Sequence, residues 1–153
     1  MNFNLVLVAP EIPGNTGSLG RTCLALNARL ILIHPLGFSL DEKSVRRAGL
    51  DYWKHVEISE YESFDQFLQK EDPKREDLFF YSKNAKKVYT QARFKPGQYH
   101  IFGSESKGLP TSMFQEYAQN FLSLPILSPH VRSLNLSNAA TAVCYEVHRQ
   151  IQA

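Results

Sequence analysis

The pattern of apolar and polar residues along the chain predicts strands that alternate with helices. Residues 3–8 and 29–33 are short apolar runs that prolines close within a few residues, which favours buried strands over helices. Between these runs, apolar positions within residues 19–26 have the spacing of one helical face, and Asn15 and Thr16 are candidate N-caps. The order of strand, glycine-bearing loop, helix and strand predicts a βαβ unit.

The remainder of the chain continues this alternation. The apolar pattern predicts further strands at residues 78–81, 99–102 and 121–126, and helices at residues 61–70, 111–119 and 136–151. Asp41 is the predicted cap of another short helix, which contains Lys43, Arg46 and Arg47. Because strands and helices alternate, the sequence predicts an α/β fold with a mainly parallel sheet flanked by helices.

The composition is that of an ordinary globular protein, and 153 residues fit one domain spanning residues 1–153. The chain has 17 Lys and Arg residues against 15 Asp and Glu residues, a net charge of +2, so any site for a polyanion must be a local patch. Cys23 and Cys144 lie far apart in no metal-binding spacing, which predicts no metal site. The chain has no disulfide framework, no signal-peptide pattern and no membrane-length apolar run, so we expect a cytoplasmic protein.

The first segment with candidate chemistry lies where the first predicted helix begins, a position that favours anions. Gly14, Gly17 and Gly20 are spaced three residues apart, which does not match the G-x-G-x-x-G pattern of a dinucleotide site, and the G-K-[ST] of a P-loop is missing. Close packing of the helix on the sheet is the alternative explanation for the glycines. Arg21 is harder to explain by packing, because it is a charged residue among small and apolar neighbours.

Two further polar segments adjoin the later predicted elements. Residues 102–110 begin at the carboxyl end of a strand, where open α/β sheets bind ligands, although an ordinary Ser/Gly turn would also explain them. Residues 132–138 lead into the last helix, where one of Ser133, Asn135 and Ser137 must be the N-cap. A cap needs only one side chain, so the remaining polar residues indicate a ligand.

Together these three segments resemble the motifs of the SpoU branch of the SPOUT methyltransferases. The resemblance covers essentially the whole chain and consists of Asn15-Thr16-Gly17 with Arg21, Phe102-Gly103-Ser104-Glu105 with Gly108-Leu109-Pro110, and Arg132-Ser133-Leu134-Asn135-Leu136-Ser137-Asn138-Ala139. Residues 9–17 and 46–52 are similar to a narrower group, the stand-alone tRNA (cytidine/uridine) 2'-O-methyltransferases that act at the wobble position of leucine tRNAs.

The resemblance implies a fold and a cofactor. The family fold is an α/β sheet whose C-terminal segment forms a deep trefoil knot. In the family the knot holds S-adenosylmethionine in a bent pose, mostly through backbone groups, and S-adenosylhomocysteine is the product. The positions that match the family's cofactor contacts are Tyr81, Gly103, Leu124, Ser133, Ile126 and Leu134.

The resemblance also implies a reaction, the attack of a ribose 2'-hydroxyl on the sulfonium methyl group of the cofactor. Its catalytic positions correspond to Arg21, Asn15, Glu105, Ser133 and Asn135. The family assigns activation of the hydroxyl to the Arg21 position. Because a guanidinium stays protonated, holding an RNA phosphate and stabilising the developing alkoxide is the physically easier role. Glu105 is then expected to orient Arg21, and Asn135 to position the ribose or Arg21.

The expected partners are the anticodon stem-loop of leucine tRNAs and a second copy of the chain, with no metal and no membrane. Arg21, Arg46 and Arg132 are the predicted RNA-binding residues. The last helix is expected to form the interface of a homodimer. Two alternatives stay open: an enzyme of this fold for another tRNA or rRNA position, and a non-catalytic RNA-binding protein.

Overall fold

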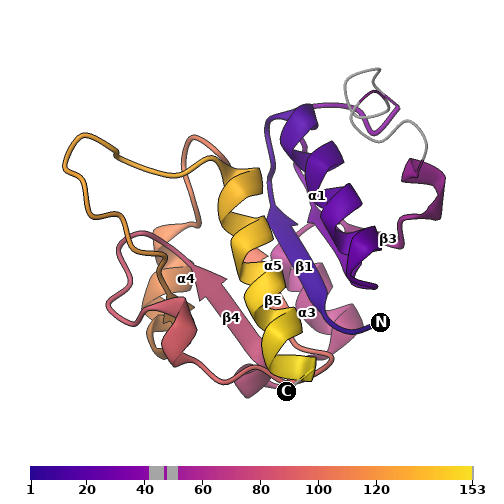
Figure 1. Ribbon diagram of the computed structural model, residues 1–153. Helices are drawn as coiled ribbons and strands as arrows, with labels where there is room; N and C mark the ends of the chain where they lie inside the picture. Colours follow the sequence, from indigo (N-terminus) through magenta and orange to yellow (C-terminus); the bar gives the residue numbers. More distant parts are fainter. Residues whose placement is uncertain (42–46, 48–51, 153) are drawn as a thin grey trace.

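The protein is built on a six-stranded sheet with the strand order β3-β2-β1-β5-β4-β6, and its paired strands are parallel. The computed structural model describes residues 1–41, 47 and 52–152 (Figure 1). Leu5 lies opposite Leu30 of one neighbouring strand and His100 of the other. The strands are β1 (Asn4–Val8), β2 (Arg29–Ile33), β3 (Ile58–Tyr61), β4 (Leu78–Tyr81), β5 (Tyr99–Phe102) and β6 (Phe121–Leu122). Because the strands are parallel, their carboxyl ends meet at one edge of the sheet.

Helices cover both faces of this sheet. They are α1 (Pro13–Ala25), α3 (Phe64–Glu71), α4 (Thr111–Glu116) and α5 (Leu136–Gln152), with short 3-10 turns η1 (Trp53–His55), η2 (Arg75–Asp77), η3 (Tyr89–Gln91) and η4 (Ala118–Asn120). Figure 1 shows α1 and α5 side by side in front of the sheet, with α3 and α4 behind it. The architecture is therefore a three-layer α/β sandwich.

Two apolar clusters fill the spaces between the sheet and the helices. On one face, Leu5 belongs to a cluster with Leu19 of α1 and Val143 of α5. On the other face, Val6 belongs to a cluster with Phe67 of α3. Because neighbouring residues of a strand point to opposite faces, β1 is buried on both sides, which explains its continuous apolar run.

The predicted parallel α/β fold is confirmed, with one strand that the apolar pattern did not predict. β3 pairs with β2 at the sheet edge and mixes polar with apolar residues, so it gives no continuous apolar run. The predicted start of the helix at residues 61–70 was consequently wrong. α3 begins at Phe64, because Ser63 is its N-cap and accepts a hydrogen bond from the backbone N–H of Gln66 at 3.0 Å.

The predicted N-caps of the first helix, Asn15 and Thr16, were also wrong. α1 begins earlier, at Pro13, and both residues lie buried inside its first turns. A proline is favoured at this first position because its missing N–H has no partner inside the helix. The side chain of Asn15 is therefore available for contacts outside the helix.

Two more boundaries differ from the predictions. The strand predicted at residues 121–126 ends at Leu122, and the next residue, Ser123, forms only an isolated parallel bridge with Val88 in the loop after β4. The helix predicted at residues 111–119 ends at Glu116. The short basic helix predicted after Asp41 lies almost entirely outside the described residues. Arg47 is described and is exposed.

Candidate active site

A cavity of about 680 Å³ opens at the carboxyl ends of β4, β5 and β6. Its walls are residues 81–84 and 102–109, residues 124, 126 and 132–136 of the segment that leads into α5, and the first turn of α1. The segment between β6 and α5 is drawn in orange in Figure 1 and projects beside the start of α5. The volume suits a small organic ligand, and the carboxyl edge of a parallel sheet is where such folds bind ligands.

The cavity brings together most of the predicted site residues. Those that line it are Asn15, Tyr81, Gly103, Glu105, Leu124, Ile126, Arg132, Ser133, Leu134 and Asn135. Arg21 does not line it, and Arg46 lies outside the described residues. Residues far apart in the sequence thus line one cavity.

The Glu105 carboxylate joins the loop after β5 to the start of α1. Its two oxygens accept the backbone N–H groups of Glu11 and Ile12, each at 2.8 Å, and the Nδ2 of Asn15 donates to it at 3.2 Å. N–H groups at a helix start have no partner within the helix, and a negative charge there is favoured by the helix dipole. Glu105 therefore fixes the position of α1 against the cavity.

A second carboxylate makes the reverse connection. Glu11 Oε1 accepts hydrogen bonds from the backbone N–H of Ser106 at 3.0 Å and from its hydroxyl at 2.6 Å. These bonds lower the pKa of Glu11, because they stabilise its charged form. The loop before α1 and the loop after β5 are thus held together by two carboxylates acting in opposite directions. Sequence reasoning missed Glu11 and Ser106, although Glu11 lies within the segment that carries the resemblance.

Asn135 connects the start of α5 to the start of α1. Its Oδ1 accepts the backbone N–H of Asn138 at 3.2 Å and the hydroxyl of Ser137 at 2.6 Å, so Asn135 is the N-cap among the three candidates. Its Nδ2 donates to Oδ1 of Asn15 at 3.3 Å. Ser133 lines the cavity without a hydrogen bond to the described residues, which leaves its hydroxyl available to a ligand.

Gly103 is required by the close approach of its own loop. A Cβ atom at this position would lie 2.0 Å from the carbonyl carbon of Gly108 and 2.3 Å from the backbone nitrogen of Leu109. Gly108 itself has a φ of 67°, in the region that favours glycine. The tight fold of residues 103–109 therefore depends on both glycines.

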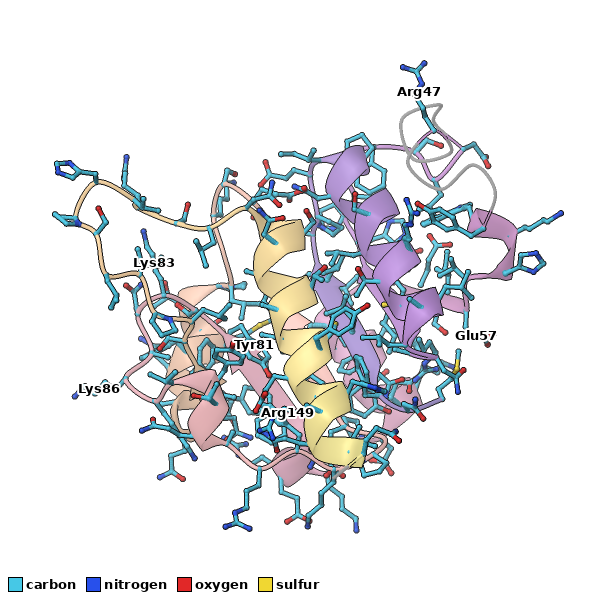
Figure 2. The ribbon with its side chains drawn as sticks, viewed as in Figure 1. Arg47, Glu57, Tyr81, Lys83, Lys86 and Arg149 are labelled. Carbon is cyan, nitrogen blue, oxygen red and sulfur yellow. The ribbon has the colours of Figure 1, made fainter. Side chains whose placement is uncertain are left out.

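Tyr81 and His100 form a polar pair in the aromatic layer beneath the cavity. The Tyr81 hydroxyl lies 2.8 Å from Nδ1 of His100, and the Tyr81 ring stacks on Phe102 (Figure 2 labels Tyr81). Burial lowers the pKa of His100 to about 3 and raises that of Tyr81 well above its ordinary value, because neither charged form is solvated. Both groups are consequently neutral near pH 7 and act as packing for the cavity wall.

Arg21 lies on the exposed side of α1. Its guanidinium carbon is 5.2 Å from the centre of the Tyr52 ring, and no contact with Glu105 is present among the described residues. The preceding residue, Gly20, is small because it packs against a side chain and not against the sheet. A Cβ at Gly20 would lie 2.4 Å from the Trp53 indole, so Gly20 makes room for Trp53 of η1.

Two other features bear on the chemistry of the site. Among residues 1–41, 47 and 52–152, no group of three or more His, Cys, Asp or Glu residues is arranged to hold a metal ion. Within that same part of the chain, no helix has the length and apolar character needed to cross a membrane.

The fold and the site define the class of protein, a SpoU-type α/β methyltransferase. The sequence pattern of the SpoU rRNA methylase family matches residues 2–145, so the chain belongs to this family. The fold is shared with a SpoU methyltransferase from Streptomyces viridochromogenes that was solved with AdoMet, at a TM-score of 0.85 and 23% identity over 97% of this chain and 60% of that one.

Closer relatives match along nearly the whole chain. The tRNA (cytidine(34)-2'-O)-methyltransferase of Burkholderia ambifaria is 42% identical over 149 residues, which cover 97% of this chain and 95% of that protein. A solved structure described as giving structural insights into the 2-OH methylation of C/U34 on tRNA is 43% identical. It covers 97% of this chain and 95% of that chain, with a TM-score of 0.90.

Proposed function

We propose that the protein transfers a methyl group from S-adenosylmethionine to the ribose 2'-hydroxyl of the wobble cytidine or modified uridine of tRNA. The observation that carries this proposal is the convergence of Asn15, Glu105, Ser133 and Asn135 on one cavity, in a chain that matches wobble-position methyltransferases over almost its whole length. We further propose that leucine tRNAs are the substrates, and that the enzyme works in the cytoplasm, where tRNA is found.

The cavity fits S-adenosylmethionine. The tightly folded loop at Gly103 presents backbone groups to the cavity. Leu124, Ile126 and Leu134 supply apolar surface for an adenine ring. Tyr81 and Ser133 complete the proposed cofactor contacts. When bound, the cofactor supplies an electrophilic methyl group, and S-adenosylhomocysteine remains.

The chain's own residues then have to position the ribose hydroxyl and stabilise its developing charge. Asn15 and Asn135 are joined by a hydrogen bond of 3.3 Å, and Glu105 holds Asn15 from the other side. This chain of contacts orients amide groups at the cavity, beside the Ser133 hydroxyl. In our proposal the Glu105 carboxylate is a positioning group, because its oxygens are already occupied by three donors.

We propose that the Arg21 guanidinium binds an RNA phosphate and stabilises the alkoxide as it forms. Its exposure on α1 supports contact with RNA. Because Arg21 lies outside the cavity of its own chain, this action requires that bound RNA or a second copy of the chain brings Arg21 and the hydroxyl together. Arg46 and Arg132 are the other proposed RNA-binding residues.

We propose that residues 1–153 form one SPOUT domain with a C-terminal trefoil knot and that it works as a homodimer. The knot is supported by the path of the chain: β6 lies beside β4 at the sheet edge, and α5, which follows it, packs against α1. The homodimer is supported by the exposed Tyr145 and Arg149 on α5 (Figure 2 labels Arg149).

The experiment that tests the proposed function is nucleoside mass spectrometry of unmodified and native tRNAs incubated with the protein and labelled S-adenosylmethionine. We expect 2'-O-methylcytidine or its uridine counterpart at the wobble position of leucine tRNAs. Methyl label in rRNA or at another tRNA position would show that the substrate is a different RNA site. Tight RNA binding without methyl transfer would indicate a non-catalytic binding protein.

A further inference from the structure

A second, smaller cavity adjoins the first on the side of the loop that leads into α5. Its volume is about 240 Å³, and its lining residues are Lys83, Asn84, Leu124, Ile126, Ser128, Val131 and Arg132. Most of these residues also line the larger cavity, so the two form neighbouring parts of one hollow. Ser128, Val131 and Arg132 are exposed, and the smaller cavity therefore opens to solvent.

Lys83 is held in this cavity by a hydrogen bond to the segment that leads into α5. Its Nζ donates a hydrogen bond of 3.1 Å to the backbone carbonyl of Arg132. An ammonium group has three donors, so two remain for a ligand. Figure 2 shows Lys83 beneath the loop that leads into α5, whereas Lys86 from the same segment points away from the protein.

The hydrogen-bonding groups that face this cavity are mainly donors. The Arg132 guanidinium makes no hydrogen bond or ion pair within the described part of the chain, and Ser128 Oγ accepts from the N–H of His130 while its own hydrogen stays available. Among the residues that the structure describes, no carboxylate lines the smaller cavity. Glu105, whose carboxylate is the only one among the described residues that line the larger cavity, is occupied by three donors. Such a surplus of cationic donors is suited to an anion.

From this arrangement, and resting on the proposed function, we infer that Lys83 and Arg132, with the Ser128 hydroxyl, bind a phosphodiester group of the substrate RNA next to the target ribose. Arg132 and the next residue, Ser133, both line the larger cavity, so a phosphate bound at Arg132 would lie near the hydroxyl proposed to face the reacting groups. The smaller cavity opens among exposed residues, so it can admit a continuous RNA backbone. The larger cavity has the volume to enclose a small cofactor.

This site supplies the local positive patch that the net charge of +2 does not provide globally. Phosphate contacts fix the register of a nucleic acid without reading its sequence. The site would therefore set the distance between the target ribose and the cofactor for any nucleotide that enters. Base selection would come from other residues.

The test compares three Lys83 variants with a matched lysine variant in the full-length protein. Lys83→Gln keeps a donor for the Arg132 carbonyl but loses the charge, Lys83→Arg keeps the charge, and Lys83→Ala loses both. Lys86→Ala removes an exposed lysine of the same segment that lines neither cavity. tRNA affinity at several salt concentrations, the KM for tRNA, and the affinity for S-adenosylhomocysteine are measured for each.

We expect Lys83→Gln and Lys83→Ala to weaken tRNA binding by roughly tenfold and to reduce its salt dependence by about one counterion. Lys83→Arg should restore most of the affinity, and Lys86→Ala should change it by less than about twofold. Cofactor affinity should be unchanged in all four variants. In an Arg132→Ala background the effect of Lys83→Gln should be smaller, because both residues contact one phosphate.

Other outcomes would overturn the inference. If Lys83→Gln binds tRNA normally while Lys83→Ala does not, Lys83 only holds the loop through the Arg132 carbonyl. If cofactor affinity falls and tRNA affinity does not, the anion at this site is the carboxylate of the cofactor. Equal effects of Lys83→Gln and Lys86→Ala would show that the general positive charge of the surface attracts tRNA, with no specific phosphate contact at Lys83. Failure of the proposed function is distinguishable, since the unaltered protein would then give no wobble methylation in the same assay.

Discussion

Glu11 and Glu105 connect the same two loops in opposite directions. The Glu105 carboxylate accepts the backbone N–H of Glu11 at 2.8 Å, while the Glu11 carboxylate accepts two hydrogen bonds from Ser106, the residue after Glu105. One of these loops opens α1, and the other forms a wall of the cavity. Removing either carboxylate should therefore alter the cavity and the start of α1 together.

Glu105→Gln should destabilise the protein and weaken cofactor binding. The amide retains one oxygen acceptor but loses the charge and one of the two bonds to the backbone of Glu11 and Ile12. Loss of a charged hydrogen bond costs about 1.5–3 kcal/mol of unfolding free energy. Urea unfolding and calorimetry with S-adenosylhomocysteine measure the two effects. Unchanged stability with unchanged cofactor affinity would contradict a positioning role for Glu105.

Glu11→Gln should change how stability depends on pH. The hydrogen bonds from Ser106 lower the pKa of Glu11 below its ordinary value of 4.5. Its charged form therefore stabilises the fold above pH 4.5, and this contribution is lost as the pH falls through the lower pKa of the folded state. The variant should lose stability near neutral pH and show a shallower fall in stability below pH 4.5.

Denaturant midpoints between pH 3 and pH 7 measure the effect of Glu11→Gln. Glu57→Gln is the matched control, because Glu57 is an exposed carboxylate away from the cavity (Figure 2). If the two variants have the same pH profile as the unaltered protein, the Glu11–Ser106 contact contributes nothing to stability in solution.

Gly103→Ala should disrupt the loop of residues 103–109 and abolish cofactor binding. The added Cβ would lie 2.0 Å from a backbone carbon of Gly108, and backbone cannot move aside as a flexible side chain can. We expect a loss of about 3 kcal/mol or more in unfolding free energy. Gly14→Ala is the control, because its added Cβ would meet no atom within 4 Å from the described residues outside its own helix backbone. This variant should be neutral or stabilising by up to about 1 kcal/mol. Equal stability of the two variants would contradict this account.

Much of this architecture could be predicted from the sequence, because the central strands are buried on both faces. The runs that became β1 and β2 contain almost only apolar residues, and such runs identify strands of a parallel sheet. β3 could not be found this way, because an edge strand needs no continuous apolar run. The start of α1 could have been found, because Pro13 is a known signal for the first helical position.

The candidate site was predicted by its motifs and completed by contacts that sequence cannot give. The resemblance identifies Asn15, Glu105 and Asn135, and the structure brings them into one hydrogen-bonded group. The hydrogen bonds that Ser106 donates to Glu11 depend on how two loops meet that are 95 residues apart in the sequence, which no local pattern encodes. The expected contact of Glu105 with Arg21 is absent among the described residues, where Glu105 accepts hydrogen bonds from the start of α1 instead.

Arg21 provides the sharpest test of the proposed chemistry. Arg21→Ala should leave the fold almost intact, because the side chain is exposed and its contact with the Tyr52 ring is worth no more than about 1 kcal/mol. If the guanidinium stabilises the forming alkoxide, the variant should lose orders of magnitude in single-turnover rate at saturating tRNA. Cofactor affinity should be nearly unchanged, because Arg21 does not line the cavity.

Arg21→Lys separates the charge of Arg21 from its shape. A lysine keeps the positive charge but loses the planar pair of donors that matches a phosphate, so it should restore only a small part of the rate. Full rescue by lysine would mean that charge alone is needed at this position. A near-normal single-turnover rate for Arg21→Ala would show that Arg21 has no part in the reaction, and the catalytic centre would then consist of the residues that line the cavity.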